Sequence, residues 1–144
     1  MSDLLHKPLN DVNASDLDEF VSRSPAEGPT LEFKGRVPAR ANETPWSAGN
    51  LRLPNHAKDD LISEVLAFLN TYGGQLLLGI RETDDPPPRA DIVQPVDACQ
   101  ELARRIDDLL MNTIDPSTSA YEVRAIAYPD GADEGVVIVR AAGP

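Results

Sequence analysis

The sequence predicts a single α+β domain in which helices pack on a mixed β-sheet. Residues 57–72 show apolar side chains at helical spacing, and an apolar run over 75–80 follows almost at once. Two further runs, 121–128 and 135–140, flank a Pro-Asp-Gly turn, which is typical of a β-hairpin. Helices and strands therefore alternate along the chain, and this order predicts a layer of helices packed on one β-sheet.

Length and charge limit the possible functions. The chain has 144 residues, and we expect residues 14–141 to form one domain behind an N-terminal tail of residues 1–13. It carries 13 Lys and Arg against 24 Asp and Glu, for a net charge of −11. Phosphate contacts dominate nucleic-acid affinity, so this charge counts against tight, nonspecific DNA binding. Any nucleic-acid surface must be a local basic strip, for which the candidates are Lys34, Arg36, Arg40, Arg52 and Lys58.

Cysteine usage and the N-terminus bear on the compartment. The single cysteine, Cys99, excludes an intrachain disulfide. The first residues lack the apolar segment of a signal peptide, and no apolar run is long enough to cross a bilayer. We therefore expect a soluble, cytoplasmic protein with no membrane partner. Because the chain ends soon after its last expected strand, it could be a domain excised from a longer protein.

A short helix is expected over residues 15–22. Ser15 is a suitable N-cap, and the acidic residues that follow it suit the positive end of the helix dipole. Ser24-Pro25 should end the helix, because a residue that precedes proline disfavours helical geometry.

A strand is expected over residues 30–36, because apolar and polar side chains alternate there. Leu31 and Phe33 fall on one face, and Glu32 and Lys34 fall on the other. The long loop that follows, 37–55, is rich in Pro, Asn, Ala and Gly and carries the only tryptophan, Trp46. Trp46 could anchor the loop to the body of the domain or could stack on a nucleobase.

The clearest predicted helix, 57–72, should end at Gly73 as its C-cap and lead into a strand over 75–80 that is buried on both faces. A second long helix is expected over 97–112, with Asp115-Pro116 as its stop. The apolar stripes of these elements predict a core. Its members are Leu61, Val65, Leu66, Leu76, Leu78, Ile106 and Leu110.

Four features in this order resemble the Schlafen-type AlbA-like domain. They are an acidic residue, Glu27; the triplet Glu32-Phe33-Lys34; the block 67–74, which reads Ala-Phe-Leu-Asn-Thr-Tyr-Gly-Gly; and an apolar strand that closes in Gly79-Ile80. The resemblance extends over roughly residues 16–140. It implies the fold of one AlbA-like lobe and a nucleic-acid-binding domain.

The resemblance also implies a chemistry. Nuclease members of the family look like metal-dependent endoribonucleases that act on structured RNA such as tRNA. They use two glutamates spaced like Glu27 and Glu32, which would hold Mg²⁺ or Mn²⁺, and a third acid just after the apolar strand. A lysine placed like Lys34 could pair with the scissile phosphate. The expected partner is RNA or single-stranded DNA.

The chain departs from the family at the third acid. Arg81 occupies the position directly after Gly79-Ile80, and Glu82 is the nearest substitute. The implied catalytic residues are therefore Glu27, Glu32, Lys34 and Glu82. A second hypothesis stays open, in which Glu27 and Glu32 are only surface groups and the domain is a non-catalytic regulatory or protein-interaction module that has lost the third acid.

Assembly follows from the same resemblance. Schlafen nuclease cores look like two AlbA-like lobes around one groove, and this chain has sequence for one lobe. We therefore expect a homodimer that places two copies of the Glu27 and Glu32 face around one channel, or else a fused or partner domain that supplies the second lobe.

Overall fold

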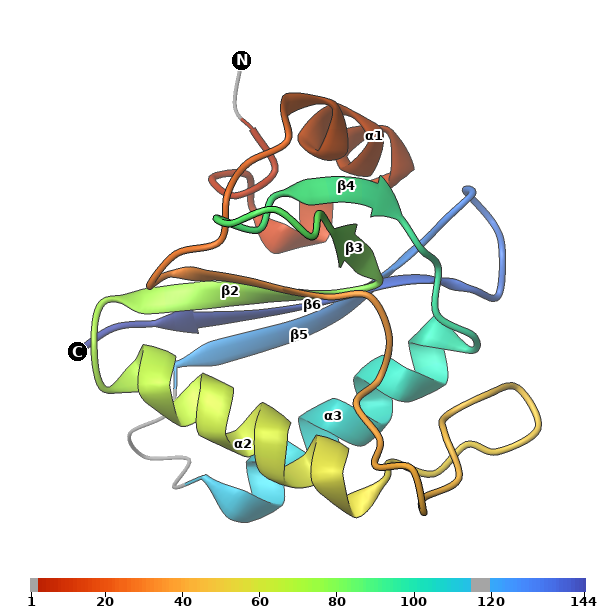
Figure 1. The fold of residues 1–144 in the computed structure, drawn as a ribbon. Coiled ribbons are helices and arrows are strands. Elements are labelled where there is room, and N and C mark those ends of the chain that lie inside the picture. Colours follow the sequence, from red (N-terminus) through yellow and green to blue (C-terminus); the bar gives the residue numbers. More distant parts are fainter. Residues whose placement is uncertain (1–2, 115–119) are drawn as a thin grey trace.

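A computed structural model describes residues 3–114 and 120–144 and shows the predicted α+β fold (Figure 1). The main sheet contains, in spatial order, β1 (Leu31–Lys34), β2 (Gly73–Leu78), β6 (Gly135–Ala142) and β5 (Tyr121–Ala127). β1 and β2 run parallel, whereas β6 is antiparallel to both of its neighbours. A separate antiparallel pair is formed by β3 (Ile80–Glu82) and β4 (Ala90–Val93).

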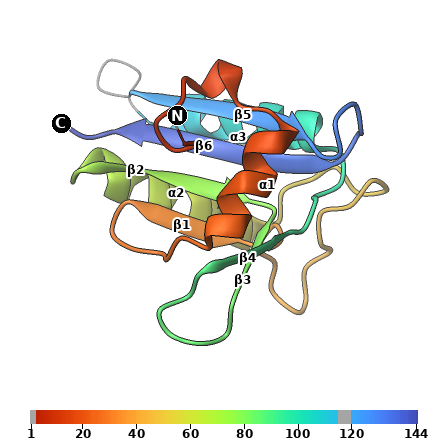
Figure 2. The ribbon, with the colours of Figure 1, turned by 90° about the horizontal axis from the view of Figure 1, so that it is seen from above.

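The helices cover both faces of the main sheet. Helices α2 (Asn55–Leu69) and α3 (Cys99–Thr113) lie on one face, and α1 (Ala14–Arg23), the short 3-10 helix η1 (Leu9–Asp11) and the β3–β4 pair lie on the other (Figures 1 and 2). Helix α2 forms the crossover between the parallel strands β1 and β2. No helix in the described ranges is both long enough and apolar enough to cross a membrane.

Two apolar clusters form the core, one on each face of the sheet. The cluster under α2 and α3 includes Leu61, Val65, Phe68, Leu76, Leu78, Ile106 and Leu110. The cluster under α1 includes Leu17, Phe20, Leu31, Phe33, Leu77, Ile80 and Ile138. The expected hairpin is confirmed, since β5 pairs with β6 along its whole length.

Leu66 was predicted to lie in the core, and this prediction is wrong. Its side chain is 39% exposed, whereas Phe68 is buried. The buried face of α2 carries Ala57, Leu61 and Val65 at four-residue spacing, and Phe68 continues that face. Leu66 lies about 100° around the helix from Val65, which turns it toward solvent.

The ends of the first helix differ from the prediction. Helix α1 begins at Ala14, and Asn13 rather than Ser15 is its N-cap. The Asn13 side chain accepts hydrogen bonds from Ser15 N and Asp16 N, and the Asp16 carboxylate accepts one from Asn13 N at 2.9 Å. This reciprocal capping box satisfies more backbone donors than a Ser15 cap would. Ser24 ends the helix, as predicted.

Gly73 does not cap α2, contrary to the prediction. Helix α2 ends at Leu69 with Asn70 as its C-cap, and Gly73 opens β2 with a φ of +78°. Glycine is required here because a Cβ would lie 2.7 Å from the backbone oxygen of Ala141 on β6.

The strand expected over 75–80 is divided in two. Gly79, with a φ of +112°, separates β2 from β3 and turns the chain out of the main sheet. β3 then pairs with β4, a strand that the sequence analysis missed because its four residues show little alternation. Helix α3 ends at Thr113, and the expected stop at Asp115-Pro116 lies outside the described residues.

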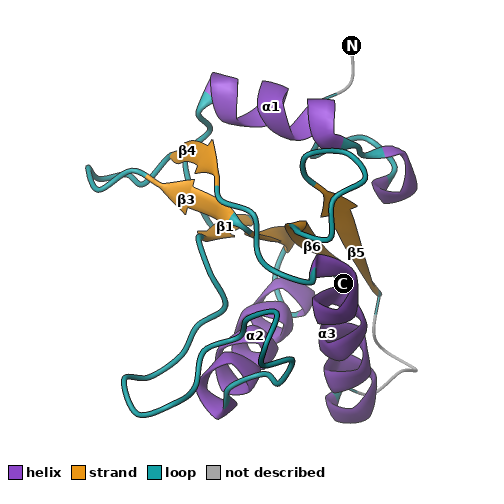
Figure 3. Cartoon of the chain, turned by 90° about the vertical axis from the view of Figure 1, so that its right-hand side faces the viewer, coloured by secondary structure: helices purple, strands orange, loops and turns teal. Residues whose placement is uncertain are grey.

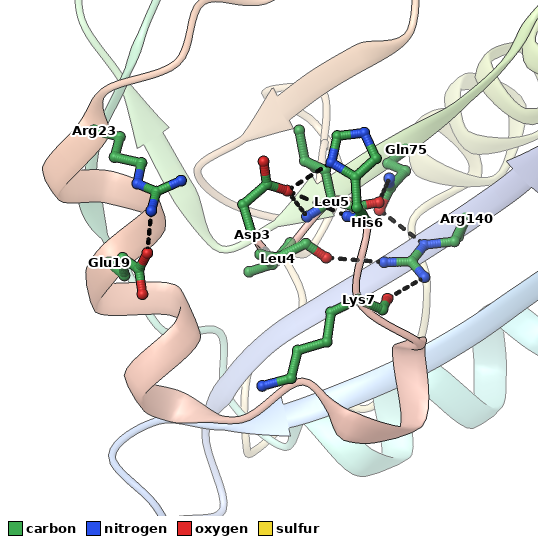
Figure 4. Close-up of polar contacts among 9 residues, drawn as sticks. All are labelled: Asp3, Leu4, Leu5, His6, Lys7, Glu19, Arg23, Gln75 and Arg140. Carbon is green, nitrogen blue, oxygen red and sulfur yellow. Dashed lines mark hydrogen bonds and ion pairs between the residues drawn. The ribbon is translucent and has the colours of Figure 1, made fainter. Parts of the chain in front are cut away.

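The segment expected as an N-terminal tail packs on the sheet. Leu4, Leu9 and Val12 are buried in the cluster under α1. Arg140 donates to Lys7 O at 2.7 Å and to Leu4 O at 3.1 Å (Figure 4). Gln75 Nε2 donates to Leu5 O at 2.8 Å, and Gln75 Oε1 accepts from Arg140 Nε. Gln75 and Arg140 together therefore hold the backbone of the N-terminal segment against the sheet.

Trp46 anchors the long loop, which leaves β1 and extends beside the helical layer before it enters α2 (Figure 3). Its side chain is 9% exposed, and its indole N–H donates to Asp97 O at 2.7 Å. The anchoring interpretation is therefore confirmed, and a buried indole is not available for stacking on a base.

Candidate functional site

The candidate site lies at the free edge of β1. Thr30 O accepts a hydrogen bond from Gln75 N of β2, and Lys34 O accepts one from Gly79 N just after β2. Even-numbered residues of β1 therefore bond to this side, and Phe33 directs its N–H away from the sheet. That N–H donates to Glu27 Oε2 at 2.7 Å. Glu27 thus folds back along the edge strand, beside the face that carries Glu32.

Lys34 joins β1 to helix α2. Its ammonium lies 2.7 Å from Asp60 Oδ2, 3.8 Å from Glu32 Oε1 and 4.0 Å from Glu64 Oε1. The Lys34 side chain is only 14% exposed. Burial alone would lower the pKa of Lys34, but the Asp60 hydrogen bond and the surrounding carboxylates raise it. Lys34 is therefore firmly charged and is already held by carboxylates.

Glu82 enters the same group from β3. Burial raises the pKa of Glu82, and a hydrogen bond with Glu27 and the charge of Glu27 raise it further. The two carboxyl groups therefore stand close enough for the charge of Glu27 to disfavour ionisation of Glu82. Glu82 Oε2 is shielded from solvent and has no hydrogen-bond partner within the described part of the chain.

Glu32 is the most strongly perturbed acid of the group. Burial, followed by the charges of Glu27 and Glu64, raises the pKa of Glu32 to about 7, although Lys34 acts in the opposite direction. Burial also raises the pKa of Glu64. We call Glu27, Glu32, Glu64 and Glu82 the carboxylate cluster; its negative charge exceeds what Lys34 can balance.

The position of Arg81 explains how Glu82 reaches the cluster. The Arg81 side chain is 53% exposed and forms an ion pair with Asp91 on β4 at 2.7 Å. The β3–β4 register shifts between Arg81 and Glu82. Neighbouring strand residues point to opposite faces, so Arg81 faces solvent and Glu82 faces Glu27.

The oxygen donors of the carboxylate cluster match the preferences of a hard divalent cation. Carboxylate oxygens are the donors that Mg²⁺ and Mn²⁺ prefer, and the raised pKa values and the orphaned Glu82 Oε2 indicate a shortage of positive charge. Among residues 3–114 and 120–144, however, no three His, Cys, Asp or Glu side chains are arranged so that they could hold a metal ion. The donor chemistry fits a divalent cation, whereas a coordination shell is not assembled in this conformation.

The expected basic strip is not one surface. Arg36, Arg40, Arg52 and Lys58 form no ion pair with any described carboxylate, unlike Lys34. Arg52 and Lys58 line a cavity of about 630 Å³ between the long loop, α2 and α3, together with Arg105. Glu43 and Asp108 line the same cavity, so its charge is mixed. The structure therefore separates Lys34, in the carboxylate cluster, from Arg52 and Lys58, which lie in this α2–α3 cavity.

Sequence reasoning missed the contribution of α2. Asp60 and Glu64 lie four residues apart on one flank of the helix, outside the buried stripe. Residues four apart lie on the same side of a helix, so this spacing places the two carboxylates next to each other. It was the one feature of the sequence that could have indicated that α2 contributes acids to the site. Which strand this flank faces could not be inferred from the sequence.

Comparisons with known proteins place the chain in a family. No curated protein matches it. It is similar to a crystal structure of the DIP2311 protein from Corynebacterium diphtheriae, with 18% identity and a TM-score of 0.47; the match covers 91% of this chain but 22% of that one. The family model described as "Schlafen, AlbA_2" matches residues 27–141, which span β1 to β6 and every member of the carboxylate cluster. The chain therefore belongs to the Schlafen AlbA_2 family.

Proposed function

We propose that this domain is a divalent-metal-dependent endoribonuclease that acts on structured RNA such as tRNA. The observation that carries the proposal is the carboxylate cluster at the edge of β1, where burial and mutual repulsion raise the pKa of Glu32 to about 7. Perturbed acids gathered around one half-buried cation are typical of a functional site. Membership of the Schlafen AlbA_2 family supports the coarser part of the proposal, a nucleic-acid-binding domain.

Three glutamates of the cluster would hold the metal. The charge of Glu27 already raises the pKa of Glu82, and a divalent cation bound between the two would relieve that repulsion. Glu32 would complete the set from β1. A bound Mg²⁺ or Mn²⁺ would supply an activated water and charge stabilisation for phosphodiester cleavage. Lys34 would position Glu32 and limit the repulsion among the acids.

Contacts to RNA would come from cations outside the cluster. Arg36 lies two residues beyond the end of β1, and Arg52 and Lys58 line the α2–α3 cavity. The net charge of −11 opposes phosphate binding over the molecule as a whole. The proposal therefore predicts a localised, salt-sensitive contact.

Incubation of the protein with tRNA and Mn²⁺ tests the proposal. The wild type and the control E134Q, which alters an exposed glutamate outside the cluster, should cleave the RNA, and E32Q should not. Gel-shift measurements in EDTA should show equal binding by all three proteins. Absence of cleavage by the wild type with Mn²⁺ and Mg²⁺ would overturn the nuclease proposal.

A non-catalytic module is the second candidate. It is favoured by the unassembled coordination shell and by Arg81, which stands at the expected acid position and pairs with Asp91. This candidate predicts RNA or protein binding without cleavage. The same incubation separates the two, because only the nuclease shortens the RNA.

A further inference from the structure

The two edges of the main sheet differ. At the β1 edge, the outward N–H of Phe33 is capped by Glu27, and charged side chains line the strand. β5 forms the opposite edge, as Figure 2 shows. It is seven residues long, and a groove of about 410 Å³ follows it between Asn10 of η1 and α3. Natural proteins usually protect such an edge. Within residues 3–114 and 120–144, no side chain accepts a hydrogen bond from an outward N–H of β5 as Glu27 does from Phe33.

The β5 backbone groups that face outward can be identified from its pairing. Ala142 N donates to Ala120 O and Tyr128 N donates to Glu134 O, so even-numbered residues of this strand bond to β6. Antiparallel pairing alternates, so the odd-numbered residues direct their N–H and C=O to the free side. These residues are Tyr121, Val123, Ala125 and Ala127.

Two opposite charges stand beside this edge. Glu122 and Arg124 lie two residues apart and so share one face of β5. Among the described residues, Arg124 has no carboxylate partner; it reaches only Asn10 Oδ1, at 3.3 Å, and its buried Nε has no partner. The positive charge of Arg124 is therefore not balanced by a described carboxylate, and an acid of a second copy could balance it at this edge.

We propose that the free edge of β5 is a homodimer interface, at which two copies of the chain pair antiparallel with Val123 on the two-fold axis. In this register the odd-numbered residues exchange backbone hydrogen bonds across the interface. Glu122 lies directly opposite Arg124 of the partner subunit, and the axis generates this pair twice.

Neighbouring registers are disfavoured by charge. An axis through Arg124 places two arginines opposite each other, and an axis through Glu122 places two glutamates opposite each other. Of these three positions of the axis, only the one through Val123 places unlike charges opposite each other. The net charge of −11 on each copy opposes association, but physiological salt screens that long-range repulsion.

The dimer would join two four-stranded sheets into one continuous sheet. Because β1 lies at the far edge, the two carboxylate clusters would stand at opposite ends of that sheet. This arrangement differs from the single channel that the sequence suggested, and it does not depend on nuclease activity.

Light scattering at physiological salt over a range of protein concentrations tests the interface. The wild type should reach twice the mass of one chain. E122R and R124E should each weaken dimerisation at least about tenfold, because each replaces two attractive pairs with two repulsive ones. The double variant E122R/R124E should restore the dimer.

A backbone variant adds a test that does not involve charge. V123P removes an N–H that faces away from β6, so the monomer should keep its circular dichroism spectrum while the dimer is lost. A wild type that stays monomeric at high concentration overturns the proposal. A dimer that survives both R124E and V123P, or one that the double variant fails to restore, also overturns it.

Discussion

Glu27 and Phe33 are joined by a hydrogen bond that gives Glu27 two roles. Its carboxylate accepts from the outward N–H of Phe33 at 2.7 Å and so closes the edge of β1. The same carboxylate adds the charge that raises the pKa values of Glu32 and Glu82. A substitution at Glu27 would change folding and electrostatics together, so Glu32, which has no backbone partner among the described residues, gives cleaner tests of the cluster.

Stability should fall as pH rises through the range in which Glu32 ionises. The pKa of Glu32 is raised from 4.5 to about 7 in the folded protein, so its contribution is fully present below about pH 4.5 and is lost as pH approaches and passes 7. The shift corresponds to about 3 kcal/mol for a shielded group. Because the side chain is 30% exposed, screening reduces the expected effect to about 1–2 kcal/mol.

The variant E32Q isolates this effect. Urea unfolding should show that E32Q is more stable than the wild type at pH 8 by about 1–2 kcal/mol and close to it at pH 4.5. E134Q, a change at an exposed glutamate, should follow the wild type at both values. Equal stability of E32Q and wild type at pH 8 would show that the cluster does not strain the fold.

Removal of the Lys34 charge should destabilise the protein, whereas removal of the Glu32 charge should stabilise it. K34M keeps the apolar stem but deletes the ammonium that contacts Asp60, Glu32 and Glu64. Loss of a charged hydrogen bond and of the balancing charge should cost about 2 kcal/mol at pH 8. The cost should shrink toward pH 5, because Glu32 and Glu64 can then take up protons. A cost that does not change with pH would contradict the coupling of Lys34 to Glu32 and Glu64 and would leave the contact with Asp60 as its source.

The corrected face of α2 can be tested with two substitutions. F68A removes a buried ring and should cost about 3–5 kcal/mol. L66A removes a side chain that is 39% exposed and should cost less than about 1 kcal/mol. Chemical denaturation of both variants measures the difference. A larger loss for L66A would restore the original prediction from the sequence.

The spacing of apolar residues predicted the helices and strands that bury a whole face. It did not predict features that depend on contacts between one element and another. The long helices, the hairpin and most of the core were predictable, because burial imposes spacings of 3.6 or 2 residues on the sequence. β4 and the division at Gly79 were not, since a four-residue strand leaves little pattern. Within the site, Glu27, Glu32 and Lys34 were suggested by the family resemblance, whereas Asp60 and Glu64 depend on how α2 rotates against β1.

Gly74 should not tolerate a side chain, although its backbone is not in the left-handed region. A Cβ at this position would overlap the ring of Phe68, because α2 packs closely on the start of β2. G74A should therefore destabilise the protein by about 1–3 kcal/mol in urea unfolding. If the ring is the obstacle, F68L should cost less in the G74A background than in the wild type, as a double-mutant cycle would show. Strictly additive costs would contradict this explanation.

Divalent cations should stabilise the protein, and they should do so most above pH 7. Glu32 is ionised there, and a cation bound to the cluster relieves its repulsion with Glu27 and Glu64. Because a ligand that binds only the folded state stabilises it by mass action, Mn²⁺ at 100 times its dissociation constant should add about 2.7 kcal/mol. Thermal melts with and without Mn²⁺ at pH 6 and pH 8 measure the effect. E82Q, which neutralises the acid that carries the orphaned Oε2, should abolish most of it, and E134Q should leave it intact. An equal shift in E82Q and wild type would place the cation elsewhere and would remove the metal from the proposed site.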